Sequence, residues 1–314
     1  MYIVSKNIDF HFIKFPILFP LIYGLVLFLL PNYEQYLIFL TILLLAEPHF
    51  GATWPFLFGK NYKEFVYKKK KELVIIPILI IIFSLSGYFF FTPFFLLVFY
   101  AANIYHVTRQ SFGVCKLYVK DKLELDYYEI LIYFFNFLFF LIGFLRFYLN
   151  IINDNHIFIM NVLLLVLLTI VVINLYLKFR NFQNILTFLT GCIIFYPIAF
   201  VENPVHAIIM GVTMHYTQYL VLTNKVTLRR FVHQNQIAEA INFSFLNNKY
   251  FLTTIIIYSL FMTFFAILNK YKLEYSYLII IPIIGQFLHF YLDSQLWKFS
   301  EKYNRENVLK YLLS

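Results

Sequence analysis

The chain has 314 residues, of which 61% are hydrophobic and only 13% are charged, and its formal net charge is +9. Soluble globular domains are about 45–50% apolar and about 25% charged, so a single aqueous core cannot bury this chain. The composition excludes a soluble enzyme, a disordered chain and a disulfide-stapled secreted domain. It predicts an all-α fold, a polytopic helical bundle integral to a membrane, and we expect that membrane to be the bacterial inner (cytoplasmic) membrane.

Apolar stretches long enough to cross a bilayer as a helix, about 20 residues each, recur along the whole chain. No linker, low-complexity tract or soluble domain separates them, so we expect one integral membrane domain over residues 1–314. The longest polar insert, residues 224–250, carries apolar residues at helical spacing and predicts a cytoplasmic amphipathic loop. The ten predicted spans, in chain order, are 15–31, 36–58, 73–91, 93–118, 129–149, 157–177, 185–201, 204–223, 251–269 and 276–296.

The distribution of positive charge sets the expected orientation. If the N-terminus is cytoplasmic, the segments on the inner side carry 21 of the 25 lysines and arginines. Such a bias is typical of cytoplasmic loops and predicts both termini in the cytoplasm. The same bias accounts for the net charge without nucleic acid, which we exclude as a partner. The lysine run 68–71 is then a topology signal and a contact for anionic membrane lipids.

Four histidines fall in the middle of predicted spans, where ionisable side chains are costly and mark functional sites. Their spans have even numbers and so run in the same direction through the membrane. Each histidine lies 11 or 13 residues from the start of its span, about 17–20 Å below the outer surface at about 1.5 Å per residue. An isolated membrane histidine more often bonds between helices, so the shared level is what favours ligands. The four are His49, His106, His215 and His289.

Neutral imidazole is a common ligand of iron, zinc and copper, so the shared level predicts a metal site. Metal-bound histidines usually donate their second ring N–H to a carboxylate or carbonyl group. Polar residues close to the four histidines could orient them or bind the metal instead; they are Glu47, Gln110, His206, Gln218 and Asp293. Asp293 has the alternative of pairing with Lys298 at the end of its helix. Tyrosines that flank the histidines are candidates for a hydrophobic substrate tunnel; they are Tyr105, Tyr216, Tyr219 and Tyr291.

The layout of these histidines resembles the bacterioopsin-related Brp/Blh family of membrane β-carotene 15,15′-dioxygenases. The matching segments are Pro48-His49 with Gly51 and Ala52, then His106, then His206 or His215, and last His289 followed by Asp293. The departures are the missing aspartate after His49, Arg109 and Gln110 beside His106, and the separation of His206 and His215 by nine positions. The resemblance implies a polytopic membrane protein whose intramembrane histidines hold Fe(II).

Our first hypothesis is therefore a membrane-embedded, histidine-ligated mononuclear iron oxygenase. Its cofactor would be Fe(2+), and its partners would be O2 and a lipophilic small molecule that enters from the bilayer, with carotenoid cleavage as one candidate reaction. A di-iron lipid desaturase or hydroxylase is an alternative, although the chain lacks the HxxHH boxes such enzymes carry. A non-enzymatic transporter with an intramembrane histidine cluster is another, and a structural protein whose histidines only bond between helices is the last.

Overall fold

Every element of the computed structural model is a helix within the part that it describes, residues 2–57, 62–152, 154–234, 247–271 and 273–314. The all-α expectation is thus confirmed for these residues. Contacts divide the chain into two compact units, residues 1–41 with 104–218 and residues 42–103 with 219–314. The boundaries fall inside helical stretches, so single helices contribute residues to both units. One membrane domain over residues 1–314 stays a prediction.

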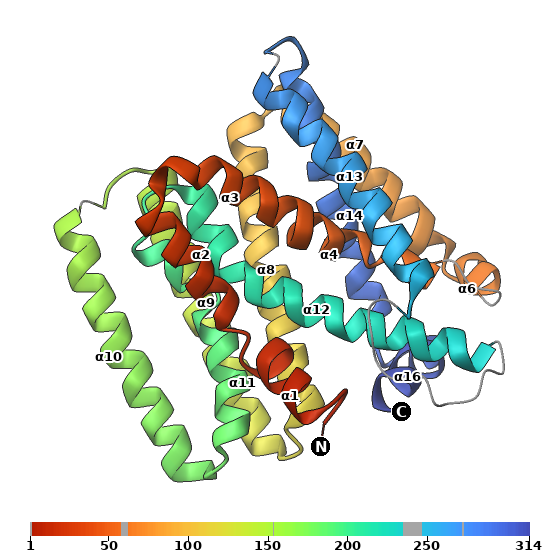
Figure 1. Cartoon of the computed structure of the whole chain (residues 1–314), viewed down its shortest axis with the longest axis horizontal. Coiled ribbons are helices and arrows are strands. Elements are labelled where there is room, and N and C mark those ends of the chain that lie inside the picture. Colours follow the sequence, from red (N-terminus) through yellow and green to blue (C-terminus); the bar gives the residue numbers. More distant parts are fainter. Residues whose placement is uncertain (1, 58–61, 153, 235–246, 272) are drawn as a thin grey trace. The chain divides into compact units, whose positions relative to one another are not determined.

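The first unit is built mainly from the N-terminal helices and from α9, α10 and α11, which Figure 1 shows in red to green. Here α11 packs against α9, α10 and the N-terminal segment η1. Asp121 and Asn181 cap the first turns of α9 and α11: the Asp121 side chain accepts hydrogen bonds from two backbone N–H groups, and the Asn181 side chain accepts one. Its elements, with η for π- and 3₁₀-helical segments, are α1 (Lys6–Ile8), η1 (Asp9–Lys14), α2 (Leu18–Leu29), η2 (Pro31–Tyr33), α3 (Glu34–Thr41), α9 (Lys122–Gly143), η5 (Phe144–Tyr148), α10 (Asp154–Phe179), α11 (Phe182–Ile193) and η6 (Tyr196–Ala199).

The second unit contains the C-terminal helices together with the segment that follows Thr41. In it α13 packs against α4, and α14 packs against both α7 and α4. Its elements are η3 (Ile42–Ala46), α4 (Glu47–Gly51), α5 (Trp54–Leu57), α6 (Tyr62–Lys68), η4 (Lys71–Ile75), α7 (Ile76–Phe90), α13 (Lys249–Tyr271), η7 (Leu273–Ile279), α14 (Ile280–Leu296), α15 (Lys302–Asn304), η8 (Arg305–Leu309) and α16 (Lys310–Leu313). Two long helices, α8 (Thr92–Tyr118) and α12 (Pro204–Gln234), run through the boundaries at 103/104 and 218/219.

Six helical segments of the described chain are long and apolar enough to cross a membrane, or seven if the bent pair Lys6–Lys14 and Leu18–Leu29 counts as one span. They indicate a membrane protein, while the ten spans and the orientation of the termini stay predictions. The six segments are Pro31–Leu57, Lys71–Phe90, Lys122–Tyr148, His156–Phe179, Lys249–Leu268 and Tyr277–Leu296.

The remaining predicted spans are not among these six segments, because their helices are too short or too polar. The stretch 185–201 is divided between the 12-residue α11 and the short η6, and 15–31 contains the 12-residue α2 after a 52° bend. Helices α8 and α12 are long, but their many polar residues lower their hydropathy. These two helices carry His106 and His215, so the functional candidates themselves weaken the apolar signal.

The helices differ in how much of their surface is buried: the most apolar helices are largely exposed, and a more polar helix is enclosed. Only 6% of the apolar window of α10 is buried, and only 11% of that of Lys71–Phe90, which comprises η4 and α7. These helices therefore present Leu, Ile and Phe side chains to their surroundings. In α12 the pattern is reversed, because His206, His215, Gln218 and the threonines of the helix are buried. Outward apolar faces suit lipid, whereas buried polar groups need partners inside the protein.

Helix α12 continues without a break to Gln234, so residues 224–234 are helical and not part of a loop. Asn224, Lys225 and Arg230 are buried, and Asn248 donates to the Asn224 side chain at 3.0 Å. These three side chains of the stretch therefore pack within the second unit, while a position of its exposed face at a membrane surface stays a prediction. The rest of the expected amphipathic pattern, including residues 237–243, lies outside the described residues.

A close approach positions α12 within the first unit. A Cβ atom on Gly211 would lie 1.8 Å from the carbonyl oxygen of Ile194, just after the end of α11. Backbone atoms cannot yield as a side chain can, so only glycine fits here. In contrast, a Cβ on Gly113 of α8 would meet nothing within 4 Å. Gly211 lies one turn before His215, so this contact also sets the depth of that histidine in the unit.

Candidate metal centre

His49 lies on a helix whose start is irregular because of its sequence. Pro48 in the first turn of α4 has no N–H to donate, and its ring would clash with the carbonyl four residues earlier in a regular helix. The preceding turn, η3, widens to π-helical geometry over Ile42–Ala46. Such π segments often occur at functional sites. The result is a fully buried His49 on a five-residue helix that ends at Gly51.

Within the second unit, α14 brings His289 to His49. The two ring centres are 4.5 Å apart with planes inclined by 64°. The ring of Tyr219 lies beside both imidazoles, 4.5 Å from His49 and 5.4 Å from His289. All three side chains are at most 4% exposed. Helices α4 and α14 thus bring together two of the four histidines that the sequence singled out.

A series of hydrogen bonds runs from His289 to the far end of α14. Thr53, in the two-residue break between α4 and α5, lies 2.6 Å from Nδ1 of His289 through its Oγ1. The same Oγ1 lies 3.2 Å from the Tyr219 hydroxyl, which donates to Oδ1 of Asp293. The indole N–H of Trp297 donates to this Oδ1 at 2.8 Å. Every member comes from the second unit.

With Asp293 ionised, one set of proton positions satisfies all of these bonds. The Tyr219 hydroxyl has a single proton, which Asp293 accepts, so Thr53 must be the donor to Tyr219. The Thr53 oxygen then accepts a hydrogen bond from Nδ1–H of His289. In that tautomer Nε2 of His289 carries the lone pair that a metal ion would need. The aspartate stabilises the tautomer through Tyr219 and Thr53.

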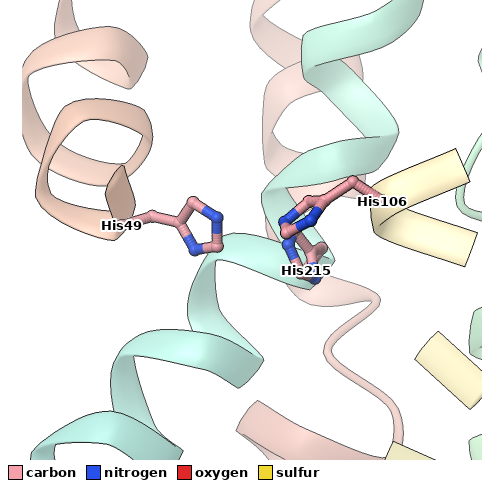
Figure 2. A group of neighbouring side chains, drawn as sticks. All are labelled: His49, His106 and His215. Carbon is pink, nitrogen blue, oxygen red and sulfur yellow. The ribbon is translucent and has the colours of Figure 1, made fainter. Parts of the chain in front are cut away.

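The first unit holds the second pair of histidines. His106 from α8 and His215 from α12 have ring centres 5.7 Å apart and nearly perpendicular planes (84°), and both are at most 7% exposed (Figure 2). His49, the third side chain drawn in Figure 2, belongs to the second unit. Gln218, one turn after His215, donates from Nε2 to the carbonyl of Ile13 at 2.6 Å. Gln218 therefore fixes α12 to the N-terminal segment of its own unit.

The spacing of each pair suits imidazoles that share one ion. A metal–nitrogen bond of about 2.1 Å places a ring centre about 3.2 Å from the metal, so two rings at 90–120° lie about 4.5–5.6 Å apart. The observed 4.5 and 5.7 Å are close to the two ends of this range. The histidines and Asp293 are buried and belong to groups that could hold a metal ion. A donor set rich in neutral imidazole suits iron, zinc or copper.

The other predicted site residues have varied surroundings. Glu47 is 2% exposed and bonds Gln286, while its Oε2 has no hydrogen-bond partner among the described residues. His206 lies 2.7 Å from the Tyr23 hydroxyl through Nδ1 and 3.6 Å from Glu34 through Nε2. Those contacts give it a structural role inside the first unit. Gln110 is half-buried beside an exposed Arg109.

The four tunnel candidates do not share one environment. Tyr216 and Tyr219 are buried, Tyr291 is half-buried, and Tyr105 is 59% exposed. Tyr219 belongs to the hydrogen-bond series described above, which gives it a polar role that the tunnel hypothesis did not include. A substrate tunnel stays a prediction.

Sequence reasoning missed Thr53 and Trp297. Trp297 follows Asp293 by four residues, a spacing that brings side chains to one helix face, and Thr53 is a polar residue four positions after His49. That spacing was the available signal, but many residues share it, and only the folded chain selects these two. No family model, no curated protein and no solved structure matches this chain.

Proposed function

We propose that the protein is a membrane-embedded non-haem iron oxygenase that acts on a lipophilic substrate, with carotenoid cleavage as the candidate reaction. The proposed ligands of Fe(2+) are the four buried histidines, His49, His106, His215 and His289. Bound iron would supply the activation of O2, which protein side chains alone do not provide.

The observation that carries the proposal is the hydrogen-bond series behind His289. Thr53 lies 2.6 Å from Nδ1, and Tyr219 and Asp293 fix the direction of the bond. Support of this kind is typical of metal-bound histidines, whose second nitrogen is held by a polar group. A histidine that only joined two helices would not need three further polar residues to set its tautomer.

The remaining features of the chain suit an apolar substrate and a dry site. His49 and Tyr219 are buried, so the residues around the imidazoles exclude water and protect reactive species. The outward apolar faces of α7 and α10 suit a protein in contact with lipid, where a carotenoid or polyprenoid would dissolve. The substrate class rests on this location and on the resemblance noted in the sequence.

The test is the iron content of the chain purified in detergent, measured by elemental mass spectrometry after anaerobic loading with Fe(II). We expect about one iron per chain in the wild type and a loss of it in the His106→Ala, His289→Ala double variant. The matched control is His206→Ala, another buried histidine, which should keep its iron.

The outcomes separate the alternatives. Two irons per chain would support a di-iron desaturase or hydroxylase. No iron after loading would overturn the oxygenase and favour a transporter or a structural role. If iron binds as expected, O2 consumption with β-carotene, measured against another polyprenoid, tests the substrate.

A further inference from the structure

A cavity of about 170 Å³ lies in the first unit, and neither His106 nor His215 lines it. Its walls come from α1, η1 and the first turn of α11, and they include Lys6, His11, Lys14 and Gln183. The volume has room for several water molecules, at about 30 Å³ each, and so for a small polar group. It is smaller than the 300–1,000 Å³ typical of pockets for drug-sized ligands.

The cavity walls carry more positive than negative charge. Lys6 and Lys14 both line it, and His11 adds a third group that can be positive. Asp9 is the carboxylate nearest to Lys14 in the sequence and is fully buried. It accepts bonds from the backbone N–H groups of residues 3–5 and from the Tyr118 hydroxyl. It offsets one lysine charge, so the lining keeps a net positive charge.

The ammonium group of Lys14 is held in place before any ligand arrives. Lys14 is 5% exposed, and its Nζ donates to Oε1 of Gln183 at 2.9 Å. The same Nζ lies 4.5 Å from the centre of the Tyr118 ring. An ammonium group has three N–H donors, so further donors are available for a ligand in the cavity. Pre-organisation of this kind lowers the entropy cost of binding.

The position of Gln183 adds to the preference for anions. It is the second residue of α11, a 12-residue helix, and the N-terminal turn of a helix carries partial positive charge. Asn7 contributes an amide to the same walls. An anion here would lie among residues that carry two ammonium groups and two side-chain amides, beside the first turn of α11.

We propose that this cavity binds a phosphate group. Its size fits one tetrahedral anion, and its net charge fits a phosphate ester. Phe10 at its wall is 36% exposed, an apolar edge that suits the acyl chains of an anionic phospholipid. Free phosphate has the same chemistry, and the experiment distinguishes the two sources. The proposal goes beyond the iron site and does not depend on it.

The test is native mass spectrometry of the full chain in detergent, titrated with phosphatidylglycerol, phosphatidylcholine or inorganic phosphate. We expect saturable binding of one phosphatidylglycerol and weaker binding of phosphatidylcholine. The Lys6→Glu variant reverses an exposed charge, so it should fold normally and weaken phosphatidylglycerol binding about 25-fold, about fivefold per unit of charge. Lys122→Glu, another exposed lysine of the first unit, is the matched control and should bind as the wild type does.

Each outcome decides the matter. Loss of phosphatidylglycerol binding in Lys6→Glu alone supports a lipid headgroup. If inorganic phosphate binds with the same dependence on Lys6 and the lipid does not, the ligand is free phosphate. Equal losses in Lys6→Glu and Lys122→Glu would show general surface attraction and overturn the proposal. Unchanged binding of both ligands in Lys6→Glu would overturn it as well.

Discussion

Replacing Thr53 by valine tests the hydrogen-bond series most directly. Valine keeps the branched shape and nearly the volume of threonine but removes the oxygen that lies 2.6 Å from His289 and 3.2 Å from Tyr219. Thr53 is 1% exposed, so water has little access to replace the hydroxyl. The buried N–H of His289 then loses its acceptor, which costs about 1–3 kcal/mol of stability.

The effect on metal binding should be larger than the effect on folding. Loss of a group that orients a ligating histidine typically weakens metal binding about 10- to 100-fold. We therefore expect the Fe(II) affinity of Thr53→Val to fall by that factor, measured anaerobically by competition with a ferrous chelator of known affinity. Thr53→Ser keeps the hydroxyl and should bind iron within a few-fold of the wild type.

A second buried threonine provides the control, because its replacement by valine removes a hydroxyl group that is not bonded to a histidine. Thr187 is 1% exposed and donates to the carbonyl of Gln183 in its own helix, far along the chain from the histidines. Thr187→Val should leave iron affinity unchanged. The reasoning is refuted if Thr53→Val binds iron as tightly as the wild type, or if Thr53→Ser loses as much affinity as Thr53→Val.

Three further predictions follow from the packing and the charges. Asp293→Asn keeps the shape but removes the charge that accepts the tyrosine proton, so iron affinity should fall while the helical circular dichroism stays unchanged. Gly211→Ala should abolish a cooperative thermal transition, because its Cβ would lie 1.8 Å from a backbone oxygen, whereas Gly113→Ala should be neutral or stabilise by up to about 1 kcal/mol. The hydrogen bond and charge of Lys69 hold the pKa of the Glu301 carboxyl below its usual 4.5. A lowered pKa stabilises the fold above that value and the effect is lost as the pH falls, so Glu301→Gln should lower the unfolding temperature near pH 7 and match the wild type in strong acid. A constant difference at every pH would contradict that assignment.

Several features of the fold were predictable from local patterns. Long apolar stretches indicated helices, and six of the ten predicted spans overlap helices that meet the membrane criterion. The others could not be judged by apolar length alone. Helix α12 has 31 residues, and two of its histidines, its threonines and Gln218 are buried. Its polar composition therefore does not indicate that the helix is enclosed by the protein. Its continuation through Asn224 to Gln234 depends on packing inside the second unit, which hydropathy does not report.

The sequence by itself determined the apolar character of the protein and singled out the four histidines as candidate donors. A chain that is 61% hydrophobic cannot bury its apolar residues in a single aqueous core, whereas the common depth of the histidines in parallel spans stays a prediction. Only the tertiary structure decided which groups support those donors. Thr53 and Tyr219 are 166 residues apart along the chain, and Tyr219 and Asp293 are 74 apart. Hydrogen bonds over such separations depend on how helices pack and not on local spacing, so they become visible only in the folded chain.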